Sequence, residues 1–350
     1  MTRNDAPVPT ALIGYGFAGR TFHAPLAAAA GLALEVVGSR DADRVHADLP
    51  AAEVLADPMA AVRHPGIELV VIATPNPTHA ALARAALEAG KHVVVDKPLT
   101  PTLAEARALA ALASSSGRML SVFQNRRWDS DFLAIRAAIE AGRVGEATHL
   151  ESRIERFRPG VRDRWREQAG AASGLWWDLG PHLVDQVLQL WGRPDRIHAD
   201  LAVQRPGATT DDWAHAVLHF GERRAILHAG MLAASPGARF VVHGTQGSMV
   251  KRGADRQEAQ LIAGLRPGDA DWGVDPDPLL WRDGGGDGPM QALPAPRGDQ
   301  ATYYRLLADA IRGQGANPVP PLQALDVMAV LEAGARSARA GRPVVPDYDG

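Results

Sequence analysis

The chain has 350 residues, of which 46% are hydrophobic and 22% charged, and this is the composition of an ordinary globular protein. Its length is enough for roughly two domains. The formal net charge of −3 gives no electrostatic reason to expect nucleic acid or an anionic membrane as a partner. There is no cysteine, which excludes disulfides and thiolate metal sites.

The chain also carries no pattern of a targeting or membrane segment. Residues 1–9 have no apolar run after their charges, so we do not expect a secretory signal. The longest apolar runs, such as 26–30, are too short to span a bilayer. We therefore expect a cytoplasmic protein.

The first 123 residues alternate between strand and helix patterns. The strand-like runs are continuously apolar, and alanine-rich stretches such as 78–89 and 103–114 predict helices between them. Such alternation is typical of a parallel sheet covered on both faces, and predicts a doubly wound α/β domain over 1–123. The expected strands are 8–13, 33–37, 69–73, 92–95 and 119–123.

After residue 123 the pattern changes. In 213–220 apolar and polar residues alternate, as on a half-exposed antiparallel strand. We therefore predict a second, α+β domain over 124–350. Its expected strands are 146–157, 196–203, 213–220, 224–231 and 239–243, and its expected helices are 131–141, 303–312 and 322–340.

The stretch 264–298 is rich in Gly, Pro and Asp and predicts a long loop. It carries apolar residues, among them Trp272 and Trp281. The stretch is either a surface loop that these apolar side chains anchor to the protein, or an arm that covers a site or a neighbouring subunit.

A glycine-rich loop, residues 14–19, follows the first strand and opens a helix. It is the G-x-G-x-x-G pattern in the context that dinucleotide binding requires. Gly14 permits a tight turn, Gly16 lets the backbone approach a pyrophosphate, and Gly19 allows close packing of helix and strand. The alternative is a glycine-rich turn in an α/β domain that binds nothing.

The residues after the second strand bear on the choice of cofactor. An NAD enzyme usually carries an acid about twenty residues past the glycines. Here that place holds Ser39, followed by Arg40, and a hydroxyl with a guanidinium suits the 2′-phosphate of NADP. Asp41 is the rival residue, because a strand one residue longer would bring it into the acid's place and favour NAD.

Two further loops follow predicted strands. The loop at 74–79 contains two prolines, and Thr78 or Asn76 can cap the next helix. Lys97 follows the fourth strand and precedes a proline, which disfavours a helical backbone for it. Ligands bind at the carboxyl ends of strands in such sheets, so Lys97 is a candidate catalytic cation. The candidate cofactor-binding residues are Gly14, Tyr15, Gly16, Phe17, Ala18, Gly19, Ser39, Arg40, Thr74, Pro75, Asn76, His79, Asp96 and Lys97.

The second domain carries one dense polar group, at 178–189. Pro181 fits the first turn of a helix, with Asp178 just ahead of it. His182 and Asp185 then lie on the face opposite the apolar stripe, which is either simply solvated or catalytic. Two carboxylates and one histidine make a poor zinc site, so we expect no metal.

These residues supply what the oxidation of an alcohol needs, if the two domains face one another. A histidine suits removal of the hydroxyl proton, because its pKa lies close to neutral. A neighbouring carboxylate can orient the ring. Lys97 can hydrogen-bond the oxygen on which charge develops.

The chain resembles the Gfo/Idh/MocA oxidoreductases. The resemblance rests on the glycine loop, the loop at 74–79, Asp96-Lys97-Pro98 and Asp178-x-x-x-His182, in this order and spacing, and it covers nearly the whole chain. Asp96 stands where the family usually has glutamate, a change that keeps the charge. The stretches 125–129, 157–159, 164–167 and 178–182 resemble the branch of NADP-dependent scyllo-inositol dehydrogenases.

The resemblance implies an NAD(P)-binding Rossmann domain joined to a second, substrate-binding domain with a large open, mostly antiparallel sheet. A homodimer or homotetramer formed through the open face of that sheet is implied as well. It also implies a cis peptide before Pro98 and the catalytic set Lys97, Asp178 and His182. For each arginine that it adds to the substrate side, a salt bridge at the surface or between domains is an equally good explanation. The substrate residues that it implies are Asn125, Arg127, Phe157, Arg158, Arg164 and Trp165, with Asp178 and His182.

The sequence therefore predicts an NADP-linked dehydrogenase, with NAD as the other cofactor, that acts on a secondary alcohol of a cyclitol or sugar such as scyllo-inositol. His182 is the expected acid/base, Asp178 orients it and Lys97 polarises the oxygen. The alternatives are a dehydrogenase for an aldose, a sugar nucleotide or a dihydrodiol, and a non-catalytic NADP-binding regulator.

Overall fold

The computed structural model describes residues 6–286 and 288–349, and the chain divides into two compact units. The first holds the described residues up to 125, together with 257–272 and 299–325. The second holds 126–256, 273–298 and the described residues from 326 onward. The predicted division of binding roles between residues 1–123 and 124–350 stays a prediction.

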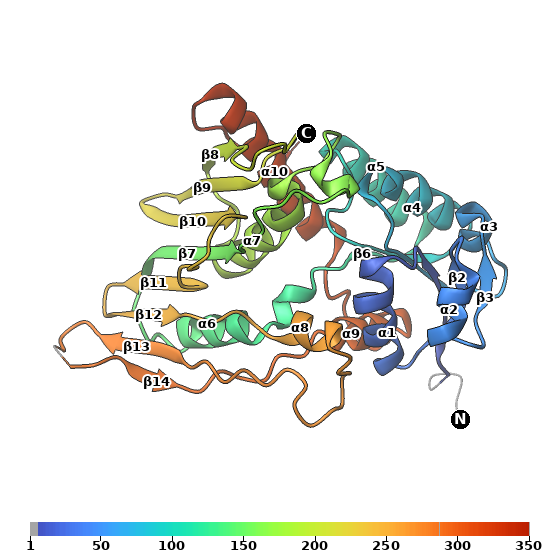
Figure 1. Ribbon diagram of the computed structural model, residues 1–350, viewed down its shortest axis with the longest axis horizontal. Coiled ribbons are helices and arrows are strands. Elements are labelled where there is room, and N and C mark those ends of the chain that lie inside the picture. Colours follow the sequence, from blue (N-terminus) through green and yellow to red (C-terminus); the bar gives the residue numbers. More distant parts are fainter. Residues whose placement is uncertain (1–5, 287, 350) are drawn as a thin grey trace. The chain divides into compact units, whose positions relative to one another are not determined.

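The first unit contains a six-stranded, wholly parallel sheet of strand order β3-β2-β1-β4-β5-β6 (Figure 1). This confirms the expected Rossmann-type fold. One strand, β3, was not expected, because three residues with an exposed or half-buried pattern give no apolar run. The strands are β1 (Val8–Ile13), β2 (Leu32–Gly38), β3 (Glu53–Leu55), β4 (Leu69–Ile72), β5 (His92–Val95) and β6 (Leu120–Val122).

Helices cover this sheet. On one side α3, α4 and α5 pack together, while α1 packs against α9 (Figure 1). The π-helix η1 continues directly into α1, so the glycine loop opens one unbroken helical segment. The helices and turns are η1 (Gly19–His23), α1 (Ala24–Ala29), α2 (Ala42–Asp48), α3 (Pro58–Val62), η2 (Asn76–Thr78), α4 (His79–Glu88), α5 (Leu103–Ser116), α8 (Gln257–Ile262) and α9 (Ala301–Ile311).

Local side-chain chemistry fixes the ends of α5. Thr102 and Glu105 form a capping box, in which each side chain bonds the other residue's backbone N–H. At the far end Gly117 adopts a φ of +61°, the left-handed conformation that glycine takes without steric cost. These signals lie within a few residues of the helix, which is why the sequence predicted it closely.

The second unit contains an eight-stranded sheet of strand order β14-β13-β12-β11-β7-β10-β9-β8 (Figure 1). All neighbouring strands are antiparallel except β7 and β10, which confirms the expected mostly antiparallel sheet. The strands are β7 (Ala147–Glu155), β8 (Arg196–Ala202), β9 (Trp213–Phe220), β10 (Arg223–Gly230), β11 (Phe240–Gly244), β12 (Gly247–Lys251), β13 (Leu279–Asp283) and β14 (Gln291–Leu293).

The two faces of this sheet differ. Along β9 buried side chains alternate with half-buried ones, as the sequence pattern predicted. The buried face packs against α7, and Trp176 of α7 donates from its indole N–H to the carbonyl of Leu331 in α10 at 2.9 Å. The expected oligomer through the other face stays a prediction. The remaining helices and turns are η3 (Asn125–Trp128), α6 (Ser130–Glu140), η4 (Trp165–Glu167), α7 (Leu175–Trp191) and α10 (Pro321–Ala340).

Two expectations for the second half of the chain were wrong. The stretch 264–298 is not one structureless loop, because it contains β13 and β14, which extend the sheet beyond β12. The helix carrying His182 begins at Leu175 rather than at Pro181, so Asp178 lies in its first turn and not ahead of it. Both features depend on partners far away in the sequence.

None of the helices in the described ranges combines the length and the apolar character needed to cross a bilayer.

The buried indole of Trp176 gives a stability prediction. Its side chain is 1% exposed, so Trp176→Ala should lower the free energy of unfolding by about 3–5 kcal/mol, because it leaves a cavity and removes the indole hydrogen bond to the Leu331 carbonyl. Leu322→Ala, at a side chain that is 69% exposed, should change it by less than about 0.5 kcal/mol. Denaturation followed by far-UV circular dichroism measures both, and equal losses would contradict the packing.

Candidate active site

In the first unit the ends of the parallel strands are tied together. The N–H of Gly14 donates to the carbonyl of Gly38 at 2.9 Å, and the N–H of Ala73 donates to the carbonyl of Ile13 at 2.8 Å. The loops that leave β1, β2 and β4 therefore begin at the same edge of the sheet. The residues that follow β1, β2, β4 and β5 directly are Gly14, Ser39, Ala73 and Asp96.

The glycine loop has the geometry that the sequence pattern requires. Gly14 has a φ of +94°, and a Cβ there would lie 2.7 Å from the carbonyl oxygen of Ala73. A Cβ at Gly19 would lie 2.0 Å from the carbonyl oxygen of Gly14. At Gly16 a Cβ would meet nothing within 4 Å, so the backbone there is open. A pyrophosphate can approach this backbone and the N–H groups of the helix that follows.

A pocket of about 370 Å³ lies beside this loop. It is formed by the ends of β1 and β2 and the segments after them, which is where the ribose and adenine of a dinucleotide bind in this type of fold. The residues present thus fit the cofactor. The pocket is lined by Ile13, Gly14, Tyr15, Gly16, Gly38, Ser39, Arg40, Asp41, Arg44, Ala56, Pro58 and Thr74.

Asp41, the rival residue for cofactor choice, caps a helix. β2 ends at Gly38, and the Asp41 carboxylate accepts from the backbone N–H of Arg44 at 3.0 Å at the start of α2. It also pairs with the Arg44 guanidinium at 3.1 Å, while its own N–H donates to the Ser39 hydroxyl at 3.1 Å. Arg40 is exposed at the pocket wall. Arg40 and Arg44 therefore both line the pocket, while the Asp41 carboxylate is already engaged by Arg44 and the start of α2.

His79 ties two of the predicted loops together. It is fully buried, and its ring nitrogens lie 2.9 Å from the carbonyl oxygen of Thr74 and 3.0 Å from that of Pro98. Asn76 is also buried, while the hydroxyls of Thr74 and Thr78 are hydrogen-bonded at 2.7 Å. The predicted cofactor contacts of these residues and of Pro75 stay predictions.

Lys97 is 9% exposed, and its backbone N–H donates to the Asp96 carboxylate at 2.8 Å. The peptide bond between Lys97 and Pro98 is cis. Behind Asp96 lies a pair that the sequence did not indicate, since His23 Nε2 lies 3.9 Å from the Asp96 carboxylate and His23 Nδ1 lies 2.6 Å from the Tyr304 hydroxyl. Burial, together with nearby Tyr303 and Asp96, raises the pKa of Tyr304 well above its ordinary value.

In the second unit the polar face of α7 is buried rather than solvated. Asp178 pairs with Arg166 at 3.2 Å, and His182 is 6% exposed one turn further along. Asp185 is held by two hydrogen bonds from Arg127, at 2.8 and 2.6 Å. The burial of these side chains excludes the alternative that this face of the helix is simply solvated.

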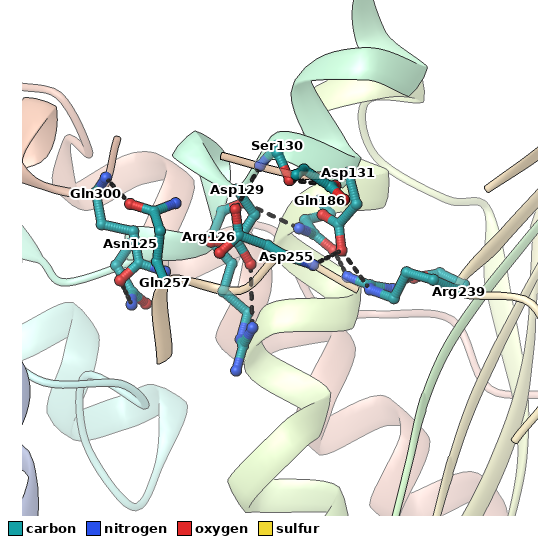
Figure 2. A network of polar contacts seen from close by, with 12 residues as sticks. Asn125, Arg126, Asp129, Ser130, Asp131, Gln186, Arg239, Asp255, Gln257 and Gln300 are labelled. Carbon is teal, nitrogen blue, oxygen red and sulfur yellow. Dashed lines mark hydrogen bonds and ion pairs between the residues drawn. The ribbon is translucent and has the colours of Figure 1, made fainter. Parts of the chain in front are cut away.

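Polar contacts connect residues 125 and 131 to other parts of their own units (Figure 2). In the first unit Asn125 donates to Gln300 at 3.0 Å, and the N–H of Gln300 donates to Gln257 at 2.7 Å. In the second unit Arg239 donates to Asp131 at 3.1 Å and to Gln186 of α7 at 2.6 Å.

The remaining substrate candidates lie on the loop between β7 and α7. Phe157 is 58% exposed, whereas Arg164 pairs with Glu167 at 2.5 Å. The Arg166 guanidinium lies 4.5 Å from the ring of Trp165. In the part of the chain that the structure describes, no group of three or more His, Asp and Glu side chains is arranged to hold a metal ion.

Comparison with known families gives matches over most of the chain. Residues 8–124 match an oxidoreductase family described as an NAD-binding Rossmann fold (GFO_IDH_MocA). Residues 136–345 match the C-terminal alpha/beta domain of the same oxidoreductase family.

Similar individual proteins cover nearly the full length. The chain is 52% identical to YdgJ of Escherichia coli, an oxidoreductase without an assigned substrate, over 94% of this chain and 95% of that protein. It is 36% identical to IolW of Bacillus subtilis, named a scyllo-inositol 2-dehydrogenase (NADP(+)), over 97% and 96%. A crystal structure of a candidate oxidoreductase from Klebsiella pneumoniae is 53% identical, with a TM-score of 0.92 and coverage of 98% and 96%.

The buried tie through His79 predicts a loss of stability on substitution. His79→Phe fills the space but cannot donate a hydrogen bond, and loss of the imidazole N–H bond to a carbonyl should cost about 1–3 kcal/mol of unfolding free energy. His198→Phe, on an exposed strand position, should change it by less than about 0.5 kcal/mol. Chemical denaturation measures both, and an unchanged stability of His79→Phe would refute the tie.

Proposed function

The chain belongs to the Gfo/Idh/MocA family of oxidoreductases, and we propose that it is an NADP-dependent dehydrogenase that oxidises a ring alcohol of a cyclitol, with scyllo-inositol as the first candidate substrate. The enzyme class, an NAD(P)-dependent dehydrogenase acting on CH–OH groups, follows from the family. The choice of NADP and of a cyclitol is the proposal.

The choice of NADP rests on the side chains that follow the end of β2. Arg40 and Arg44 both line the pocket beside the glycine loop, while Asp41 is engaged as the cap of α2. A guanidinium binds phosphate in a bidentate way, so the two arginines suit the extra 2′-phosphate of NADP. A carboxylate that already caps a helix is a poor partner for a free ribose hydroxyl pair.

The proposal assigns the chemistry to three side chains. NADP⁺, when bound, supplies the acceptor for the hydride of the alcohol carbon. Lys97 donates a hydrogen bond to the substrate oxygen as it becomes a carbonyl. His182 accepts the hydroxyl proton, and Asp178, one turn earlier on α7, keeps the imidazole oriented.

Two observations support a cyclitol as substrate. IolW, which is named for the NADP-linked oxidation of scyllo-inositol, is similar over nearly the whole of both chains. The predicted substrate residues Asn125, Arg127 and Arg158 offer N–H donors that suit a molecule with many hydroxyl groups. Trp165 and Phe157 can pack against the apolar face of a ring.

Cofactor choice is tested at Arg40. Removal of a guanidinium from a phosphate should raise the Michaelis constant for NADP⁺ by about tenfold or more, which is about 1.4 kcal/mol, in Arg40→Ala and again in Arg44→Ala. The constant for NAD⁺ should stay the same. Arg84→Ala, at an exposed arginine of α4, is the control and should change neither. Equal effects on NADP⁺ and NAD⁺ would contradict the proposal.

Substrate class is tested by a screen of NADP⁺ and NAD⁺ reduction with scyllo-inositol, myo-inositol and a set of aldoses, followed by absorbance of the reduced nicotinamide. We expect the highest kcat/KM with NADP⁺ and a cyclitol. Faster turnover of an aldose would move the assignment to a sugar dehydrogenase, and no turnover of any polyol would overturn the proposal.

The catalytic roles are tested by Lys97→Met and His182→Asn. Loss of the oxygen's hydrogen bond or of the acid/base should lower kcat by about a hundredfold or more, since each such group contributes about 10²–10⁴ to the rate. NADP⁺ binding, measured by calorimetry, should show that the His182 variant still binds the cofactor. Wild-type turnover in either variant would exclude the role of that side chain.

A further inference from the structure

Arg205 lies on the loop between β8 and β9 and is buried although the loop is irregular. Its side chain is 3% exposed, and no sequence pattern marks it. Burial of a guanidinium is costly unless acceptors surround it. The identity of those acceptors shows what the residue holds together.

Four acceptors surround this guanidinium. It donates to the Asp212 carboxylate at 2.9 Å and to the Glu167 carboxylate at 2.9 Å. It also donates to the carbonyl oxygens of Arg158 and Gly160, each at 3.2 Å. Because the guanidinium is a rigid planar fork, one side chain holds the backbone near the start of the segment 157–167 and the Glu167 side chain at its end.

Glu167 in turn binds two further residues of the segment. Its carboxylate accepts from the N–H of Arg162 at 3.1 Å and from the guanidinium of Arg164 at 2.5 Å. Burial raises the pKa of Glu167, but these hydrogen bonds, with that from Arg205, outweigh burial and lower it overall. Glu167 is therefore ionised at neutral pH and ties Arg164 to Arg205.

The loop of Arg205 also braces the start of α7. Asp211, next to Asp212, accepts from the N–H of Trp176 at 2.7 Å through its side chain and from the N–H of Leu175 at 2.8 Å through its carbonyl. A Cβ at Gly174 would lie 2.0 Å from the Asp211 carboxylate, so the contact is close. The first turn of α7 contains Asp178, which pairs with Arg166.

The space among these side chains is too small for a substrate. The cavity that Arg205, Glu167, Asp178 and Asp212 line has a volume of about 10 Å³. A cavity of that size holds at most one water molecule. Arg205 therefore does not act by contact with a bound sugar or cyclitol at this place.

We propose that Arg205 is a positioning residue, which holds the substrate segment 157–167 against the first turn of α7 and so sets the affinity for the polyol. The inference rests on the proposed function, because the segment's role in substrate binding is part of that function. It adds a residue from a loop that carries none of the predicted site.

The test compares Arg205→Lys with Arg239→Lys. Lysine keeps the charge but cannot reach four separate acceptors, so the segment should lose its fixed place. Arg239 is the matched control, since it is equally buried and bonds Asp131, Ser152 and Gln186 without contacting the segment. Both variants should lose thermal stability.

Only Arg205→Lys should raise KM for the polyol, by about tenfold to a hundredfold, with a smaller change in kcat and an unchanged dissociation constant for NADP⁺. An unchanged KM in Arg205→Lys, or an equal rise in Arg239→Lys, would overturn the inference. If Arg205→Lys does not fold, Glu167→Gln replaces it, because it removes the ion pair between Glu167 and Arg205 at nearly constant shape. The same rise in KM is then expected, and an unchanged KM would again overturn the inference.

A second measurement separates this inference from the proposed function. Trypsin added to the native protein cuts after arginines of a mobile segment unless proline follows, and the segment offers Arg162, Arg164 and Arg166 as cleavage sites. Cleavage there should be faster in Arg205→Lys than in the wild type and in Arg239→Lys. If the wild type oxidises no polyol, the proposed function fails, whereas equal cleavage in the three proteins would show that Arg205 does not hold the segment.

Discussion

The parallel pairing of β1 with both β2 and β4 is the constraint on which the candidate site depends. The register places Ile13 opposite Gly38 on one side and opposite Ile72 on the other, so the three strands end level. The backbone hydrogen bonds between these strands continue one residue past their carboxyl ends, at Gly14 and Ala73. As a result the phosphate loop, the pocket wall with Arg40 and the loop at Thr74 start at one edge, and β5 brings Lys97 to the same edge.

The second unit relies on a different interaction, the buried guanidinium paired with a carboxylate. Each such arginine joins segments that are distant in the sequence, and each donates to at least two acceptor oxygens. Pairs of this kind add little net stability, because the ions lose their hydration, but removal of one partner is costly. They specify one arrangement of loops around α7, and the arginines concerned are Arg127, Arg205 and Arg239.

The sequence predicted what local patterns encode. β1, β5 and β9 have the predicted bounds, because continuous apolar runs and strict alternation are properties of a few neighbouring residues. β13 and β14 were missed, since their strand character depends on an edge formed by β12. The start of α7 was misplaced for the same reason, as its capping residue Asp211 comes from a distant loop. In the site, the glycine loop and Lys97 follow from local spacing, whereas His23 behind Asp96 and Arg205 have no local signal.

The proposed reaction transfers a hydride from a cyclitol carbon to NADP⁺, and isotope transfer tests this step. The enzyme is incubated with NADP⁺ and scyllo-inositol that carries deuterium on the ring carbons, and the mass of the reduced nicotinamide is then determined. We expect the NADPH formed to carry the deuterium, and the reaction to be slower than with the unlabelled polyol. Reduced cofactor without deuterium, or none formed with either polyol, would contradict the proposed reaction.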